Sequence, residues 1–140
     1  MFNELGDVQV PRAYFPGISS DDIDDLQLHI FVDGSETAYA CVAYLRASIN
    51  GEYHSALVSA KAKVAPLKAL SIPRLELQAV LIGCMLMKTL CSSHSLQIKR
   101  RIFWTDSTTV LSWIHSDHRR YRQFVACRIG EILAKSNPEE

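Results

Sequence analysis

The sequence has few cysteines, and none of them stands in a metal-binding pattern. Only four of its 140 residues are cysteine, and no two are spaced as Cys-x-x-Cys. We therefore predict isolated, buried or partly buried thiols in a reducing compartment, and no cysteine-based zinc site. His115 and His118 lie three residues apart without partner cysteines, so a surface loop is predicted there. The four cysteines are Cys41, Cys84, Cys91 and Cys127.

Long apolar runs are missing as well. The longest, Leu77 to Met87, is interrupted by Gln78 and is too short to span a bilayer. No basic segment followed by an apolar stretch opens the chain, so we expect no cleaved secretion signal. The composition, 48% hydrophobic and 21% charged, is that of an ordinary globular protein. We expect one intracellular domain without a membrane association.

The chain also lacks a net charge, because 15 basic residues balance 15 acidic ones. The distribution is uneven: residues 1–36 hold eight acids against one base, and residues 99–128 hold seven bases against two acids. Such a basic segment could follow a phosphate backbone. Solvated positions on a strand edge and a helix face explain it equally well, and both interpretations stay open.

Hydrophobic periodicity divides the chain into a lead-in, a domain and a tail. Residues 1–25 are predicted to be a lead-in or linker, residues 26–136 the domain, and residues 137–140 a tail. Apolar residues alternate from Leu26 to Val32, which predicts a strand that ends at Asp33. Strands over about 38–47 and 53–61 follow, joined by Asn50-Gly51, a strong signal for a type I′ hairpin turn.

The second half is predicted to be mostly helical. Pro73 favours a helix start, and residues 74–91 continue it without a further proline. A fourth strand is predicted over 99–105, and helices over 107–115 and 121–134. The order is β-β-β-α-β-α-α. Because a helix separates the third and fourth strands, the fourth is expected to return parallel to the first in a mixed sheet.

Three carboxylates stand at the edges of these elements. Asp33 ends the first strand, Asp106 ends the fourth, and Glu76 is expected in the first turn of the long helix. Convergence of the three would favour a bound Mg²⁺, which prefers oxygen ligands. Each has a simpler explanation: Asp33-Gly34 as a turn, Glu76 as a partner of the helix dipole, and Asp106 as a helix N-cap.

The motifs around these carboxylates resemble a known family. They occur in the order found in the ribonuclease H-like region that follows the reverse transcriptase in Pao/BEL-type retrotransposon polyproteins. The resemblance extends from about Val10 to Ile132. It is carried by Asp33-Gly34-Ser35-Glu36, Lys63-Val64-Ala65-Pro66-Leu67, Ile72-Pro73-Arg74-Leu75-Glu76-Leu77, Phe103-Trp104-Thr105-Asp106-Ser107 and Phe124-Val125-Ala126-Cys127-Arg128-Ile129.

This resemblance implies a function and its components. The family's catalytic and metal-binding residues correspond to Asp33, Glu76 and Asp106, which would hold two Mg²⁺ or Mn²⁺ ions and hydrolyse the RNA strand of an RNA–DNA hybrid during reverse transcription. Expected partners are the reverse transcriptase and integrase regions of the same polyprotein. The expected location is a cytoplasmic retroelement particle with access to the nucleus. Weaker nucleic-acid contacts are assigned to Ser35, Arg74, Gln78 and Ser107.

The sequence departs from the complete family pattern at its end. A complete ribonuclease H-like fold adds a fifth strand and a closing helix with a fourth carboxylate. The printed chain stops at Glu140, directly after the helix predicted over 121–134. We therefore expect a truncated fold without the final strand and helix, in which Glu139 and Glu140 do not supply that carboxylate. Weak metal binding at one of the two positions, and impaired cleavage, would follow.

Two other functions are considered. The first is a non-catalytic retroelement remnant that binds nucleic acid weakly or not at all. The second is an aspartic peptidase of the Pao type, which requires Asp-Thr-Gly or Asp-Ser-Gly. The chain instead contains Asp33-Gly34-Ser35 and Asp106-Ser107-Thr108, neither of which fits.

Overall fold

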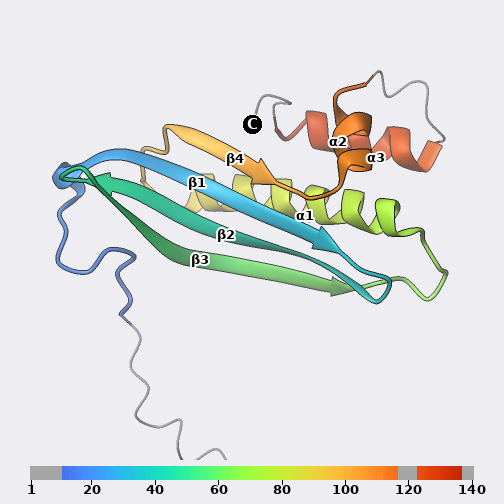
Figure 1. Cartoon of the computed structure of the whole chain (residues 1–140), viewed down its shortest axis with the longest axis horizontal. Coiled ribbons are helices and arrows are strands. Elements are labelled where there is room, and N and C mark those ends of the chain that lie inside the picture. Colours follow the sequence, from blue (N-terminus) through green and yellow to red (C-terminus); the bar gives the residue numbers. More distant parts are fainter. Residues whose placement is uncertain (1–10, 117–122, 137–140) are drawn as a thin grey trace, which may run out of the picture.

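The chain forms one four-stranded mixed sheet with helices packed on one of its faces (Figure 1). The computed structural model describes residues 11–116 and 123–136. The strands run along most of the domain and the longest helix lies behind them. A short 3-10 helix, Ser20–Asp22, precedes the sheet. The other elements are β1 (Ile23–Gly34), β2 (Ala38–Ile49), β3 (Glu52–Val64), α1 (Ile72–Ser93), β4 (Arg100–Trp104), α2 (Thr108–Ile114) and α3 (Gln123–Leu133).

The sheet has the strand order β3-β2-β1-β4. β1 pairs antiparallel with β2, and β2 pairs antiparallel with β3. β4 pairs parallel with β1, with Phe31 opposite Trp104. The predicted mixed sheet and the order β-β-β-α-β-α-α are therefore confirmed. The ends of β1 and β4 point to the same edge of the sheet, where Asp33 and Asp106 lie.

The turn between β2 and β3 follows from its two residues. Asn50 has φ +51° and Gly51 has φ +80°. Positive φ at both central positions is the signature of a type I′ turn, whose twist matches that of the flanking strands. Asparagine and glycine tolerate this backbone better than other residues do, and so the hairpin could be predicted from the sequence.

The core lies between the sheet and α1. Leu26, Leu28, Ile30 and Val32 point from β1 toward the helix and are buried, as their alternation predicts. α1 approaches β1 closely at Gly83, where an added Cβ would lie 2.9 Å from Val32 Cγ1. α3 packs on α1 and contributes the buried residues of its inner face. The helices therefore cover the inner face of the sheet.

Several predicted bounds differ from the structure. β1 begins at Ile23 rather than Leu26, because Ile23 pairs with Ile49 and packs against the core. β3 continues past Lys61 to Val64, since its partner strand β2 begins only at Ala38, which lies opposite Val64. The last helix is described from Gln123, so the predicted start at Tyr121, like the tail 137–140, lies outside the described residues.

Part of the predicted lead-in is attached to the domain. Tyr14, Phe15 and Ile18 pack against the core. The Tyr14 hydroxyl is hydrogen-bonded to Nε2 of His94 at 2.8 Å, which ties the lead-in to the end of α1. Among the described residues, this segment therefore contributes to packing.

α1 is the one helix in the described part of the chain that is long and apolar enough to cross a membrane by length and composition. It has 22 residues, twice the length of the apolar run recognised in the sequence. Most of it, 61% of the tested window, is buried inside the domain. Such burial is typical of a core helix.

Candidate active site

Asp33 is the last outward-facing residue of β1. It pairs with Ala40 of β2, and its side chain is exposed. The turn to β2 begins only after Gly34, and the Ser35 N–H donates to the carbonyl of Ala38 at 2.8 Å to close it. The interpretation of Asp33-Gly34 as the turn itself is therefore wrong, because Asp33 belongs to the paired strand.

Glu76 lies directly beside the end of β1. A Cβ added to Gly34 would lie 2.7 Å from the backbone nitrogen of Glu76 and 2.8 Å from the carbonyl carbon of Leu75. Only glycine allows the strand and the helix to approach this closely. The sequence pattern Asp-Gly in β1 thus positions the backbone of Glu76 next to Asp33.

Glu76 does not lie in the first turn of α1, contrary to the prediction. The helix begins at Ile72, with Ser71 as its N-cap and proline in the second helical position. Glu76 is therefore the fifth residue of the helix. Its carboxylate is also not limited to an interaction with the helix dipole, since its Oε2 accepts a hydrogen bond from the Ser107 hydroxyl at 2.6 Å.

Ser107 connects the motif around Asp106 to the motifs around Glu76 and Asp33. It is 7% exposed, and its Oγ accepts from the Val110 N–H at 3.3 Å while its hydroxyl donates to Glu76. Its own N–H donates to Thr105 Oγ1 at 3.1 Å. Ser107 is thus the N-cap of α2, and the proposal that Asp106 is the cap is wrong. The cap fixes the loop that carries Asp106.

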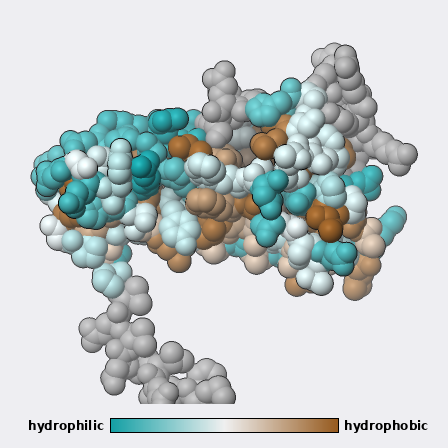
Figure 2. All heavy atoms as spheres, in the orientation of Figure 1, coloured by the Kyte–Doolittle hydropathy of each residue, from teal (hydrophilic) through white to brown (hydrophobic). Residues whose placement is uncertain are grey.

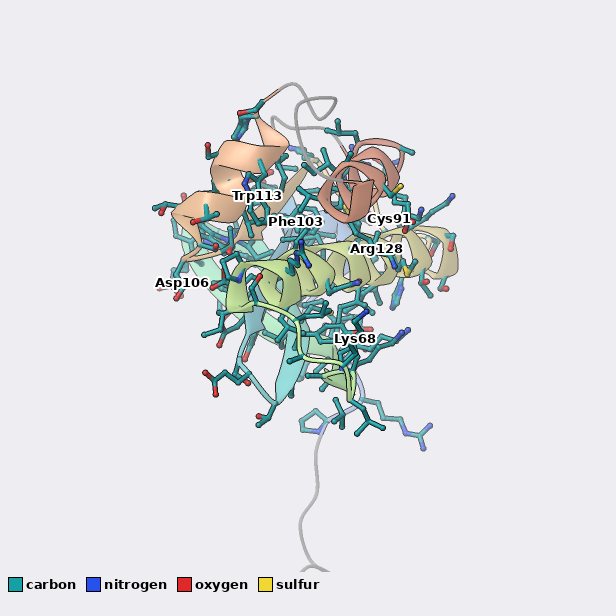
Figure 3. All side chains as sticks on the ribbon, turned by 90° about the vertical axis from the view of Figure 1, so that its right-hand side faces the viewer. Lys68, Cys91, Phe103, Asp106, Trp113 and Arg128 are labelled. Carbon is teal, nitrogen blue, oxygen red and sulfur yellow. The ribbon has the colours of Figure 1, made fainter. Side chains whose placement is uncertain are left out.

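Asp106 remains exposed at the same edge of the sheet. β4 pairs with β1 in parallel up to Trp104 and Phe31. Asp106 and Asp33 each lie two residues after this last pair. Figure 3 looks onto this edge, and Asp106 is labelled beside the beginning of α1. The three motifs therefore meet in one region of the surface.

The three carboxylates do not, however, form a finished metal site. Among the residues that the structure describes, no group of three His, Cys, Asp or Glu side chains is close enough to hold a metal ion. The predicted convergence is therefore not seen at the level of side chains. Asp33 Oδ1 accepts from the Gly34 N–H at 2.7 Å, and Glu76 Oε2 accepts from the Ser107 hydroxyl at 2.6 Å. The donor chemistry, carboxylate oxygen only, suits Mg²⁺ or Mn²⁺.

The four residues assigned to nucleic-acid contacts have different surroundings. The Ser35 hydroxyl is used in its own turn, where it donates to the carbonyl of Ala38 at 3.1 Å. The Ser107 hydroxyl is engaged by Glu76 and Val110, so it is not available for a direct contact with a phosphate. Arg74 and Gln78 are half-buried in the first two turns of α1. Ser107 is thus a positioning residue for Glu76.

Sequence reasoning missed two contributors to this region. The first is Gly34, which the pattern Asp-Gly indicated only as a turn residue. The second is Thr105, whose hydroxyl accepts from the Ser107 N–H. Its signal was present, because threonine two residues before a helix cap often accepts a backbone hydrogen bond.

Comparison with known proteins agrees with this arrangement. The Pao retrotransposon-like RNaseH-like domain matches residues 1–107, a span that includes all three carboxylates and ends at Ser107. The chain belongs to the Pao retrotransposon RNaseH-like domain family. The family assignment confirms the resemblance found in the sequence up to Ser107, while the motif over Phe124 to Ile129 lies outside the matched residues. A comparison with the curated proteins found no match.

A solved structure is also similar to this member of the Pao family. The crystal structure of RNase H1 from the halophilic archaeon Halobacterium salinarum NRC-1 aligns with a TM-score of 0.45 and 13% sequence identity. The alignment covers 79% of this chain and 80% of that chain.

Proposed function

We propose that this domain hydrolyses the RNA strand of RNA–DNA hybrids with the help of divalent cations, within a retrotransposon polyprotein. Asp33, Glu76 and Asp106 are the residues proposed to hold the cations, Mg²⁺ or Mn²⁺. The proposal rests on one observation above the others. The Gly34 backbone lies against the Glu76 backbone, and the Glu76 carboxylate is hydrogen-bonded to Ser107, so motifs from three distant segments meet at one place.

The chain's own residues would contribute position and charge. Ser107 keeps the Glu76 carboxylate turned toward the loop that carries Asp106. The side chains of Asp33 and Asp106 are exposed, so a phosphate group and water could reach both carboxylates. Divalent cations bound there would activate a water molecule and stabilise the leaving oxygen. The 2′-hydroxyl and the shape of the hybrid would distinguish RNA from DNA.

The family context extends this proposal to partners. The hybrid would arise from reverse transcription, so the reverse transcriptase and integrase regions of the same polyprotein are the proposed neighbours of the domain. The proposed location is accordingly a cytoplasmic retroelement particle with access to the nucleus. Arg74 and Gln78, near the start of α1, are proposed as contacts to the nucleic-acid backbone.

The experiment is cleavage of a labelled RNA–DNA hybrid in the presence of Mg²⁺ or Mn²⁺. We expect cleavage by the wild-type chain and its loss in Asp33→Asn, Glu76→Gln and Asp106→Asn. Glu52→Gln serves as the matched control, because Glu52 is an exposed carboxylate next to the turn at the opposite end of the sheet. Absence of cleavage by a folded wild-type chain, or equal cleavage by the control and the three variants, would overturn the proposal.

A second candidate is a domain that keeps the fold without catalysis. The observation that favours it is the absence, within the described residues, of three carboxylates close enough to share a metal ion. It predicts no cleavage with either cation and no change in thermal stability on metal addition. Cleavage and thermal unfolding, measured on one preparation of the protein, therefore distinguish the two candidates.

A further inference from the structure

The hydroxyl of Ser107 is held in one orientation by two partners. Its oxygen accepts the N–H of Val110 at 3.3 Å. A serine hydroxyl has a single hydrogen to donate, and here it donates to Oε2 of Glu76 at 2.6 Å. Only 7% of Ser107 is exposed, so little water reaches it to compete for this hydrogen. Ser107 is therefore a fixed donor to one particular oxygen of Glu76.

This contact belongs to the framework of the domain. Glu76 lies in α1, which packs on the sheet, and Ser107 follows β4, which pairs with β1. The N–H of Ser107 donates to Thr105 Oγ1 at 3.1 Å, so the loop is also held from the side of β4. The position of the Ser107 hydroxyl is thus set by strand pairing, helix packing and the cap of α2 together.

Only one oxygen of the Glu76 carboxylate is engaged. Within the described part of the chain, its other oxygen, Oε1, has no hydrogen-bond partner. Asp33 is arranged in the same way: Oδ1 accepts the Gly34 N–H at 2.7 Å, and Oδ2 has no partner among the described residues. Each of these two carboxylates therefore has one oxygen used by the protein and one oxygen open.

Hydrated cations have access to these open oxygens. The side chain of Asp33 is exposed and that of Glu76 is half-buried. Figure 2 shows hydrophilic residues at the surface near the end of β1, among hydrophobic ones. The two carboxylates can therefore exchange water for a cation without a change in the fold.

The number of open oxygens decides which cation such a site favours. Mg²⁺ binds carboxylates in near-octahedral geometry and keeps several of its water molecules. Ca²⁺ takes about six to eight oxygens, often including both oxygens of one glutamate. Mn²⁺ shares the preference of Mg²⁺ for octahedral oxygen ligands. Carboxylates that offer one oxygen each therefore suit Mg²⁺ and Mn²⁺ better than Ca²⁺.

We propose that Ser107 determines the cation selectivity of the candidate active site by holding Oε2 of Glu76, so that Glu76 binds a cation through Oε1 alone. Ser107 acts through Glu76 and is a positioning residue. The inference rests on the proposed function, because it requires a cation at Glu76. It deepens that function by assigning the preference for Mg²⁺ and Mn²⁺ over Ca²⁺ to one buried hydroxyl.

Removal of the hydroxyl has opposite consequences for the two kinds of cation. In Ser107→Ala, Oε2 loses its partner and the carboxylate can turn both oxygens toward one cation, which favours Ca²⁺. Mg²⁺ loses a ligand that was held in place, and the loss of such an orienting partner lowers metal affinity about 10–100-fold. We therefore expect the selectivity to shift toward Ca²⁺ by about tenfold or more.

The experiment is displacement of bound Mn²⁺ by Mg²⁺ and by Ca²⁺, followed through the electron paramagnetic resonance signal of free Mn²⁺. It needs no nucleic acid and no cleavage. The concentrations of Ca²⁺ and Mg²⁺ that release half of the bound Mn²⁺ give the selectivity as a ratio. We expect Mg²⁺ to act at the lower concentration in wild type. Ser107→Ala should shift the ratio toward Ca²⁺, and Ser107→Thr, which keeps a hydroxyl, should restore it.

Two further variants separate selectivity from stability. Thr105→Val removes the acceptor of the Ser107 N–H and weakens the same loop, but it leaves the hydroxyl and its bond to Glu76 in place. Its selectivity should equal that of wild type. Ser107→Gly removes the hydroxyl with a residue that is tolerated as an N-cap, so it replaces Ser107→Ala if the alanine variant does not fold.

The outcomes distinguish this inference from the proposed function. If wild type binds no Mn²⁺, or if Glu76→Gln binds it as tightly as wild type, the proposed function fails and the inference fails with it. If binding depends on Glu76 but Ser107→Ala and Ser107→Gly keep the wild-type ratio, the inference alone is overturned. A shift in Thr105→Val as large as that in Ser107→Ala would also overturn it, because the loop and not the hydroxyl would then set the selectivity.

Discussion

The hydroxyl of Ser107 donates a hydrogen bond to Oε2 of Glu76 over 2.6 Å, across 31 residues of sequence. The same oxygen of Ser107 accepts the N–H of Val110 and caps α2. One buried side chain thus links the orientation of a candidate catalytic carboxylate to the start of a helix. Capping of α2 and the orientation of the Glu76 carboxylate are therefore coupled at this residue.

Removing the Ser107 hydroxyl should therefore reduce stability. Ser107→Ala loses a helix cap and a hydrogen bond to a charged group, and we expect a decrease of about 1–3 kcal/mol in the free energy of unfolding. Urea unfolding measures it. Ser107→Thr keeps the hydroxyl and should retain most of the stability. A fully stable Ser107→Ala variant would mean that the link to Glu76 contributes nothing.

The close approach of β1 to α1 should not tolerate a side chain at Gly34. In Gly34→Ala the new Cβ would meet the backbone of Glu76 at 2.7 Å, and backbone cannot move aside cheaply. We expect a loss of at least about 1–3 kcal/mol, as overpacking gives. Gly130→Ala is the control: nothing lies within 4 Å of its added Cβ, and it should be neutral or stabilising by up to about 1 kcal/mol in α3. Thermal unfolding of both variants side by side checks the contrast.

Stability should fall on acidification because of His29. Burial, and secondarily Arg46 and Arg100, lower its pKa in the folded chain below the ordinary 6.5. As the pH drops below 6.5, the unfolded chain binds a proton that the folded chain does not, so the unfolded state gains. The loss grows until the pH reaches the lowered value.

Unfolding midpoints in urea at about pH 7.5 and pH 5.5 test this dependence on His29. His29→Gln keeps a group that can accept from the Trp104 indole but does not titrate. The variant should therefore lose less stability between the two pH values than wild type does. An equal loss in both proteins would show that other groups cause the effect.

Divalent cations should raise the stability of the chain if the carboxylates bind them. At a concentration ten times the Kd, a single site adds about 1.4 kcal/mol. We expect Mg²⁺ or Mn²⁺ to raise the midpoint of thermal unfolding in wild type and not in Asp106→Asn. Equal increases in both proteins would point to nonspecific screening by salt.

The sequence predicted those features that depend on local chemistry. Alternation from Leu26 to Val32 gave the buried face of β1, and Asn50-Gly51 gave the turn through its positive φ values. The position of Glu76 was predicted less well. The helix begins at Ile72, one residue before the predicted start at Pro73, and this places Glu76 in the second turn.

The details of the site depend on contacts between distant segments, and no local pattern contains them. Both aspartate and serine are good N-caps, and only the packing against Glu76 decides in favour of Ser107 over Asp106. The side-chain arrangement of the three carboxylates is likewise set by the partners each finds. The stacking of Phe31 on Trp104 was not predicted either, because the two rings come from strands whose register the sequence does not state.

The two outer strands of the sheet differ in how they would meet another chain. β4 is only five residues long and begins with Arg100 and Arg101, so charge and shortness oppose edge-to-edge pairing. β3 presents 13 residues along its free edge. Lys61 and Lys63, together with the irregular register beside Ser59, interrupt that edge. Edge-to-edge pairing at β3 is therefore opposed by a few charged residues and one bulge, and not by shortness of the strand.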